Sequence, residues 1–189
     1  MSLVVTINGS PSATSRTTKL TASVGAGLAL DGFDVRAINV RDIPAEDLLH
    51  ARADAPAIRA ALALVERARG VIISTPIYKA SYTGILKAFL DLLPQAGLRD
   101  KVVLPLCTGG TLAHVLAIDY ALRPVLLSLG APHVVEGLFV LDKTIELDDT
   151  GTVRLPPEVR QRLDSVVGQL TSAIHTQHAR PALPRPAAA

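Results

Sequence analysis

The sequence predicts a three-layer α/β protein in which helices cover both faces of a five-stranded parallel sheet. Short apolar runs of strand length alternate with longer segments of helical spacing. Crossovers between successive parallel strands are right-handed, and they place the intervening helices on the two faces of the sheet. Glycine, proline and aspartate separate the segments and mark the turns.

The individual elements follow from these patterns. The predicted strands are apolar runs bounded by turn residues, and they cover residues 3–7, 34–40, 70–75, 101–106 and 133–141. The predicted helices repeat apolar residues every three or four positions, and they cover residues 17–30, 56–69, 83–93, 112–129 and 157–175. Residues 43–54 are expected to be irregular, and residues 148–151 to form a turn.

The chain of 189 residues fits one domain, which we place at residues 1–175. Residues 176–189 are rich in proline and alanine without periodicity, and we expect a mobile C-terminal tail there. Half of the residues are apolar but only 3% are aromatic, so the core should be aliphatic.

Composition also limits which binding partners and which cellular compartment are expected. The formal charge is +2 and the basic residues form no dense stripe, so no nucleic-acid partner is expected. The single Cys107 excludes an internal disulfide framework and suits a reducing, cytoplasmic compartment. No signal-peptide pattern and no apolar stretch of membrane-spanning length occurs, so no membrane association is expected.

The loop after the first predicted strand has the composition of an anion site. It reads Asn8-Gly9-Ser10-Pro11-Ser12-Ala13-Thr14-Ser15-Arg16-Thr17-Thr18 and leads into a helix, whose free N–H groups and dipole attract an anion. The candidate ligands are Ser10, Ser15, Arg16, Thr17 and Thr18. Neither Gly-x-Gly-x-x-Gly nor Gly-Lys-Ser/Thr is present, so the loop suits a terminal phosphate such as that of FMN. The alternative is a turn that only caps the helix.

Two further loops should lie on the same edge of the sheet, because ligands of doubly wound folds bind outside the carboxyl ends of the strands. After the third strand come Pro76, Ile77, Tyr78 and Lys79, and after the fourth come Thr108, Gly109, Gly110 and Thr111. The first group offers an aromatic ring, a cation and backbone amides, and the glycines of the second let backbone approach a flat ring. Each loop alone could be a plain turn, but together the three describe a flavin mononucleotide site.

Several motifs in order also resemble the NADPH-dependent FMN reductase family, especially the reductase component of two-component alkanesulfonate monooxygenase systems. They are Gly9-Ser10-Pro11 with Ser15-Arg16, Ala45-Glu46-Asp47-Leu48-Leu49, Thr75-Pro76-Ile77-Tyr78-Lys79-Ala80-Ser81-Tyr82-Thr83-Gly84, Leu90-Asp91-Leu92-Leu93-Pro94, and Thr108-Gly109-Gly110-Thr111 through Asp119-Tyr120-Ala121-Leu122. The resemblance implies a flavodoxin-like fold with the strand order 2-1-3-4-5. It also implies phosphate and ring contacts at the loop residues named above.

The resemblance adds two more residues. His114 would help to hold the ring edge, although a histidine in a first helical turn is more often structural. Tyr120 corresponds to a tyrosine linked to a π-bulge at a subunit interface near the flavin, and the alternative is an ordinary interface aromatic. A dimer or tetramer is implied, which the apolar residues of 112–129 also favour.

The chemistry expected from this resemblance needs no catalytic side chain, because hydride passes directly from NADPH, or NADH, to FMN. Reduced FMN would then be released to a flavin-dependent monooxygenase. No metal-ligand cluster and no Gly-x-Ser-x-Gly elbow occurs, and Cys107 is interpreted as structural. The alternatives are a quinone, azo or chromate reductase that retains its FMN, and a flavodoxin-like electron carrier, which the mild basicity and few aromatics disfavour.

Overall fold

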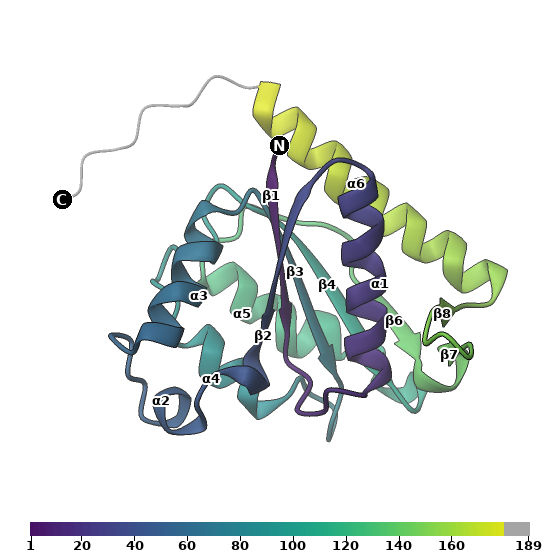
Figure 1. Ribbon diagram of the computed structural model, residues 1–189, viewed down its shortest axis with the longest axis horizontal. Coiled ribbons are helices and arrows are strands. Elements are labelled where there is room, and N and C mark those ends of the chain that lie inside the picture. The colour runs from purple at the N-terminus through teal and green to yellow at the C-terminus, as the bar shows by residue number, and fades with distance from the viewer. Residues whose placement is uncertain (180–189) are drawn as a thin grey trace.

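A parallel sheet forms the centre of the protein, whose computed structural model describes residues 1–179 (Figure 1). The strands are β1 (Leu3–Asn8), β2 (Asp34–Asn39), β3 (Gly70–Pro76), β4 (Val102–Gly109), β5 (His133–Val134) and β6 (Leu138–Leu141). Their order is β2-β1-β3-β4-β5, and β6 also pairs with β4. All of these pairings are parallel, which confirms the predicted class and strand order.

Helices cover both faces of this sheet. They are α1 (Arg16–Leu30), α2 (Ala45–Leu49), α3 (Pro56–Arg67), α4 (Gly84–Leu90), α5 (Arg123–Ser128) and α6 (Pro157–Ala179), with short 3₁₀ turns η1 (Val40–Asp42) and η4 (Asp142–Thr144). Successive strand side chains point to opposite faces, so Val4 packs in the core under α1 and α6, and Val5 in the core under α3, α4 and α5. Both cores are mainly aliphatic, as the composition predicts.

The last strand differs from its prediction as one run over residues 133–141, because β5 and β6 are separate. β5 pairs with Val102 and Val103, and β6 pairs with β4 from Leu106 onward. Pro105 lies between these two stretches of β4 and has no N–H to donate to a ladder. The edge strand leaves the sheet at this point and rejoins it after Gly137.

The helix predicted over residues 112–129 is also wrong as a single element. The segment consists of a 3₁₀ turn, η2 (Leu112–His114), a π-helix, η3 (Ile118–Leu122), and then α5. The Arg123 amide donates to the carbonyl of Ile118, five residues back, as in a π-helix. Pro124 follows directly and has no amide hydrogen, so it cannot donate the next hydrogen bond of a regular α-helix.

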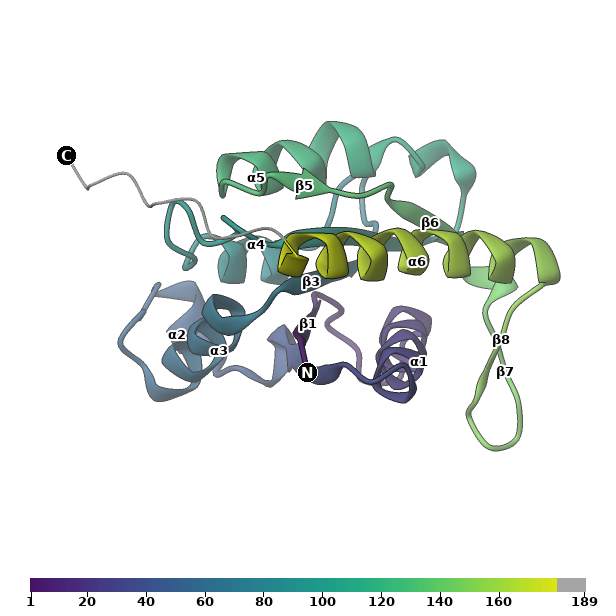
Figure 2. The same cartoon turned by 90° about the horizontal axis from the view of Figure 1, so that it is seen from above.

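Two smaller differences and one confirmed turn lie in the connections. The short α2 occupies part of the segment 43–54 that was predicted to be irregular. The predicted turn 148–151 closes a hairpin of β7 (Glu146–Leu147) and β8 (Val153–Arg154), which projects from the rest of the chain in Figure 2. Helix α6 continues past position 175 to Ala179, so the predicted tail 176–189 begins inside it, and its remaining residues lie outside the described range. Within residues 1–179, no helix is long and apolar enough to cross a membrane.

Candidate functional site

The path of the first loop, residues 9–15, is set by its contact with the start of α4. A Cβ added to Gly9 would lie 2.6 Å from Cβ of Leu86, closer than real Cβ contacts allow. The hydroxyl of Thr83, which caps α4, donates to the Gly9 carbonyl at 2.6 Å. The loop therefore requires glycine at this position, and its first residue is fixed to a neighbouring element of the same sheet edge.

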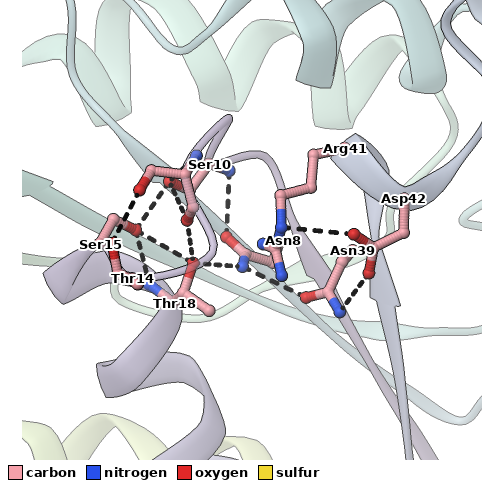
Figure 3. A network of polar contacts seen from close by, with 9 residues as sticks. Asn8, Ser10, Thr14, Ser15, Thr18, Asn39, Arg41 and Asp42 are labelled. Carbon is pink, nitrogen blue, oxygen red and sulfur yellow. Dashed lines mark hydrogen bonds and ion pairs between the residues drawn. The ribbon is translucent and has the colours of Figure 1, made fainter.

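Three of the predicted phosphate ligands form one hydroxyl cluster: Ser10, Ser15 and Thr18 (Figure 3). The hydroxyls of Ser10 and Ser15 are 2.7 Å apart, and those of Ser15 and Thr18 are 3.0 Å apart. Ser15 is also the N-cap of α1, where its oxygen accepts the Thr18 amide at 3.1 Å. Ser15 therefore caps the helix, and the same arrangement places a close group of hydroxyl donors at the start of this 15-residue helix.

Asn8 supports this cluster from the end of β1, and sequence analysis did not assign it a role. Its amide group donates to the Thr18 hydroxyl at 2.9 Å, and its carbonyl oxygen accepts the Ser10 backbone amide at 3.0 Å. It also contacts Asn39 at the end of β2, at 3.4 Å. A buried asparagine that ends an otherwise apolar strand was the available signal, because a buried amide must be hydrogen-bonded.

The same network extends to a second cation that the sequence did not single out. Asn39 donates to Asp42 at 3.0 Å, and Asp42 pairs with Nε of Arg41 at 3.3 Å. Nη1 of Arg41 is buried and has no hydrogen-bond partner within the described residues. Its charge lies at the far end of the Asn8 network, at the same edge of the sheet (Figure 3).

Arg16 is held at the first turn of α1 by one hydrogen bond. Its Nε donates to the carbonyl of Ile145 at 3.1 Å, which connects α1 to the segment before β7. The side chain is exposed, and no hydrogen bond or ion pair within the described residues uses its two terminal amino groups. Those groups remain available for a bidentate contact with a phosphate beside the hydroxyl cluster.

Thr17 and Thr108, both predicted as ligand contacts, bind each other instead. Their hydroxyls are 2.6 Å apart and both residues are buried. Helical geometry explains the outcome for Thr17, because it follows Arg16 by one position and so faces the sheet rather than the loop. The pair connects α1 to β4, and these two side chains are not available to an anion in the first loop.

The loop after β3 contains a strained turn. Pro76 ends the strand and Ile77 is buried, whereas Tyr78 is 54% exposed. The backbones of Tyr78 and Ser81 exchange two hydrogen bonds, of 2.8 and 3.1 Å, around Lys79 and Ala80. Both central residues have positive φ, 50° and 62°, as a type I′ turn requires, although neither is glycine or asparagine. Such strain is typical of ligand-binding loops, and Lys79 in this turn is exposed.

The glycine that ends β4 and the glycine that follows it are in different surroundings. A Cβ on Gly109 would lie 2.7 Å from Cζ of Phe139, so core packing alone already requires glycine at this position. Gly110 is exposed and a Cβ there would meet nothing within 4 Å, which leaves space for a ligand plane. Thr111 caps the following 3₁₀ turn through its hydroxyl, at 3.2 Å from the Ala113 amide, and half-buried His114 ends that turn.

An apolar cavity of about 370 Å³ lies beside two of these loops. Pro11 of the first loop and Tyr78 of the third-strand loop both line it, together with Leu48 of α2 and Ile85 of α4. The structure thus brings together residues that are separated by more than sixty positions in the sequence. A hydroxyl and arginine site next to an apolar wall fits a ligand with one phosphate and one flat apolar part.

Cys107 takes no part in this site. It is buried in β4, and burial raises the pKa of its thiol to about 12. The thiolate is the reactive form, so burial and the raised pKa both agree with the structural interpretation of Cys107. Across residues 1–179, no three His, Cys, Asp or Glu side chains lie close enough together to hold a metal ion.

The fold and the loops define a class: α/β proteins that hold a phosphorylated ligand at the carboxyl edge of a doubly wound sheet. A family model described as NADPH-dependent FMN reductase matches residues 2–146, and the chain belongs to this family. It is therefore an oxidoreductase of FMN reductase type, with FMN and a nicotinamide nucleotide as its cofactors.

Individual relatives agree over nearly the whole chain. The chain is 45% identical to an "FMN reductase (NADPH)" of Pseudomonas putida over 186 residues, which cover 98% of this chain and 92% of the relative. It is 42% identical to an "FMN reductase (NADPH)" of Escherichia coli K12, over 91% of this chain and 90% of the relative. The apo form of the NADH:FMN oxidoreductase EMOB has a TM-score of 0.82 at 39% identity, covering 97% of this chain and 92% of that structure.

Proposed function

We propose that the protein reduces free FMN with NADPH and releases the reduced flavin to a partner monooxygenase. The observation that supports this most directly is the hydroxyl cluster beside Arg16 at the start of α1. It lies at the same edge of the sheet as the loops after β3 and β4. Of these features, the cluster and the arginine recognise the phosphate, and the loops after β3 and β4 recognise the ring.

The residues fit FMN in a specific way. Ser10, Ser15 and Thr18 would turn their hydroxyls from one another toward the phosphate, while Arg16 supplies the charge. Tyr78 and Gly110 would lie along the ring, one offering an exposed aromatic side chain and the other open space. Bound FMN supplies the chemistry as a hydride acceptor, so the chain has only to position it and the nicotinamide.

The nicotinamide nucleotide is proposed to be NADPH. Relatives at 45% and 42% identity are named for NADPH, whereas a 37% identical FMN reductase of Pseudomonas putida, SfnE, is named for NADH. Lys79 and Arg16 are candidate contacts at this edge for the additional phosphate of NADPH. NADH remains the alternative donor in the assay below.

Release of the flavin is proposed from the π-helix η3. Tyr120 lies within this element and is 80% exposed, which agrees with the π-bulge expected at this tyrosine. π-helical turns are rare and are frequently found at functional sites. We infer that this segment lies at a subunit interface close to the loop after β4, where it can influence how firmly the ring is held.

Assembly into a dimer or tetramer is proposed from the surface of residues 112–127, which include η3. Its exposed large apolar side chains are Leu112, Val115, Leu116, Tyr120 and Leu127. A face with this many apolar groups is costly to leave in water, and a second copy of the chain would cover it. The interface would then include Tyr120.

The partner is proposed to be a flavin-dependent monooxygenase of the kind that oxidises sulfonates. The support is the resemblance over the motifs of residues 9–122 and the 42–45% identity to NADPH-dependent FMN reductases. A cytoplasmic location is proposed with it, because the donor NADPH and a free thiol both belong to a reducing compartment.

The test is steady-state oxidation of NADPH by the purified protein, with and without added FMN, while the flavin content of the preparation is recorded. We expect nearly colourless protein whose NADPH oxidation saturates with added FMN. Adding an alkanesulfonate monooxygenase with its sulfonate and O2 should release sulfite from the sulfonate, while the reduced flavin is reoxidised to FMN. NADH in place of NADPH should give lower kcat/KM.

Two results would contradict the proposal. Yellow protein with activity independent of added FMN would indicate a reductase that retains its flavin, with quinones, azo compounds or chromate as the next substrates. FMN that cycles by single electrons, with no NADPH oxidation, would indicate an electron carrier.

A further inference from the structure

A second hollow, of about 930 Å³, lies at the opposite edge of the sheet from the three loops. It is bounded by the end of α3 and by the segment that precedes β4. Arg69 and Lys101, which line it, directly precede β3 and β4, so this basin opens at the amino ends of the strands. In Figure 1 this is the upper end of the sheet, near the N-terminus, whereas the loop after β1 is at the bottom.

Positive charge is concentrated in the basin. Its cationic side chains are Arg59, Arg67, Arg69, Arg99 and Lys101, and its carboxylates are Glu66 and Asp100. Five cations against two carboxylates leave a surplus of three positive charges, which exceeds the formal charge of +2 of the whole chain. The function proposed above uses none of these residues.

Two of the five cationic side chains have a role in the local structure. Lys101 is buried, and its Nζ donates to the carbonyls of Glu66 and Ala68 at 2.9 and 3.1 Å, which satisfies the end of α3. Arg67 lies in the last turn of α3, where the helix dipole favours a cation. Because Lys101 is buried and bound to these carbonyls, we do not count it among the groups that could bind a ligand.

Arg59, Arg69 and Arg99 have no such role in the described structure. All three are exposed, and none forms a side-chain hydrogen bond or an ion pair with another residue of the described chain. The nearby carboxylates do not neutralise them, since neither Glu66 nor Asp100 is in an ion pair within residues 1–179. Three guanidinium groups around one hollow are therefore free to bind oxyanions.

The walls between the charges are apolar. Helix α3 presents Arg59, Leu62, Ala63 and Glu66 to the basin, a spacing that places them on one helical face. Leu93, Pro94 and Gly97 form part of the facing wall. A ligand that fits here carries several negative charges and an organic part of moderate size.

We infer that this basin binds an organic polyphosphate of nucleotide size, at a site separate from the flavin loops. Guanidinium groups match phosphate oxygens in bidentate geometry, and several of them are needed for a diphosphate or triphosphate. The volume lies within the range of about 300–1,000 Å³ that is usual for small-molecule sites.

The experiment is calorimetric titration of the FMN-saturated protein with ADP and with inorganic pyrophosphate. Saturation with FMN occupies the hydroxyl cluster at the other edge. ADP should bind and should bind more tightly than pyrophosphate, because only ADP has an organic part for the apolar walls. The variant Arg69→Gln/Arg99→Gln should bind ADP at least about tenfold more weakly, because it loses two charge-assisted contacts. Its FMN reduction should be unchanged.

The matched control is Arg36→Gln/Arg162→Gln, which removes the same charge from exposed positions outside the basin. Its ADP affinity should equal that of the parent protein. Absence of ADP binding, or an equal loss in both double variants, would overturn the inference. Loss of ADP binding in Arg16→Ala would assign the ligand to the flavin edge instead. Binding of an aspartate-rich peptide without binding of ADP would make the basin a protein-docking surface and would equally overturn it.

Discussion

Gly137 packs against Ile118, the first residue of the π-helix η3. A Cβ added to Gly137 would lie only 2.7 Å from Cγ2 of Ile118. The same added Cβ would lie 3.4 Å from Cβ of Pro105, the residue of β4 that has no amide hydrogen. The break between β5 and β6 and the π-helix therefore pack directly against each other. The edge strand opens where β4 cannot donate, and Ile118 fills the space that a side chain at position 137 would need.

The first prediction follows from this contact. Gly137→Ala should lower the free energy of unfolding by about 1–3 kcal/mol, the usual range for overpacking a core. Its φ is not positive, so the loss would come from contact with Ile118 and not from backbone strain. Urea unfolding measures the effect, and Gly168→Ala, whose Cβ meets nothing within 4 Å, is the control. If Gly137→Ala/Ile118→Ala is no more stable than the sum of the single variants predicts, the contact is not the cause.

The second prediction concerns the charge at the start of α1. Arg16→Ala should weaken FMN binding by about 10- to 100-fold, the loss expected for a hydrogen bond to a charged group. Riboflavin has no phosphate, so its affinity should change little. Flavin fluorescence titration compares the two ligands, and Arg162→Ala, on the exposed face of α6, is the control. Equal losses for FMN and riboflavin would show that the phosphate lies elsewhere.

The third prediction separates the two roles of Ser15. Aspartate is as good an N-cap as serine, so Ser15→Asp should preserve the stability of the protein. Its carboxylate would repel a phosphate bound at the hydroxyl cluster, and FMN affinity should fall by at least about tenfold. Thermal unfolding and fluorescence titration measure the two effects. Ser15→Ala is the converse variant, and it should cost about 0.5–2 kcal/mol of stability through loss of the cap. Full FMN affinity in Ser15→Asp would remove Ser15 from the phosphate site.

The main features of the fold were predictable because they depend on local patterns. Buried parallel strands such as β3 are continuous apolar runs, and right-handed crossovers then leave few topologies. The breaks were not predictable, because they depend on contacts between distant residues. Pro105 was visible in the sequence, but nothing there showed that the missing amide would meet Gly137 and Ile118.

In the candidate site, too, local patterns were predictable and contacts between distant residues were not. The hydroxyls of Ser10, Ser15 and Thr18 were identified because each falls at a strand end or a helix start. Thr17 belongs to the same run of residues, but helical rotation turns it toward Thr108. Asn8 was missed because its role depends on the loop folding back over the end of β1. Composition predicts the chemistry of the loop, whereas the direction of each side chain depends on the completed fold.

The fourth prediction tests the exposed apolar face of residues 112–127. Leu116→Asp/Tyr120→Asp should lower the oligomeric state, because two charges would be buried without partners in the proposed interface. Light scattering coupled to size-exclusion chromatography measures the mass in solution. Leu30→Asp/Leu49→Asp alters two exposed leucines elsewhere and should leave the mass unchanged. A parent protein that is monomeric at micromolar concentration would contradict the interface.

The fifth prediction concerns the pH dependence of the Cys107 thiol. Burial raises its pKa from 9.0 to about 12, and only the thiolate reacts with alkylating reagents. Native protein at pH 8 should therefore resist iodoacetamide, whereas protein unfolded in urea should react rapidly at this single cysteine. Mass spectrometry measures the extent of alkylation, and Cys107→Ala is the control for reaction at other groups. Equal rates in native and unfolded protein would show that the thiol is accessible.

The same pKa shift makes the contribution of Cys107 to stability depend on pH at the alkaline end. Since the native pKa lies above the unfolded value, the folded state favours the protonated thiol. Its contribution to stability is complete below about pH 9 and is lost progressively as the pH rises toward 12. Cys107→Ala removes this titration, so its urea midpoint should fall less steeply over that range than that of the parent protein. Parallel curves for the two proteins would mean that Cys107 titrates alike in the folded and unfolded chains.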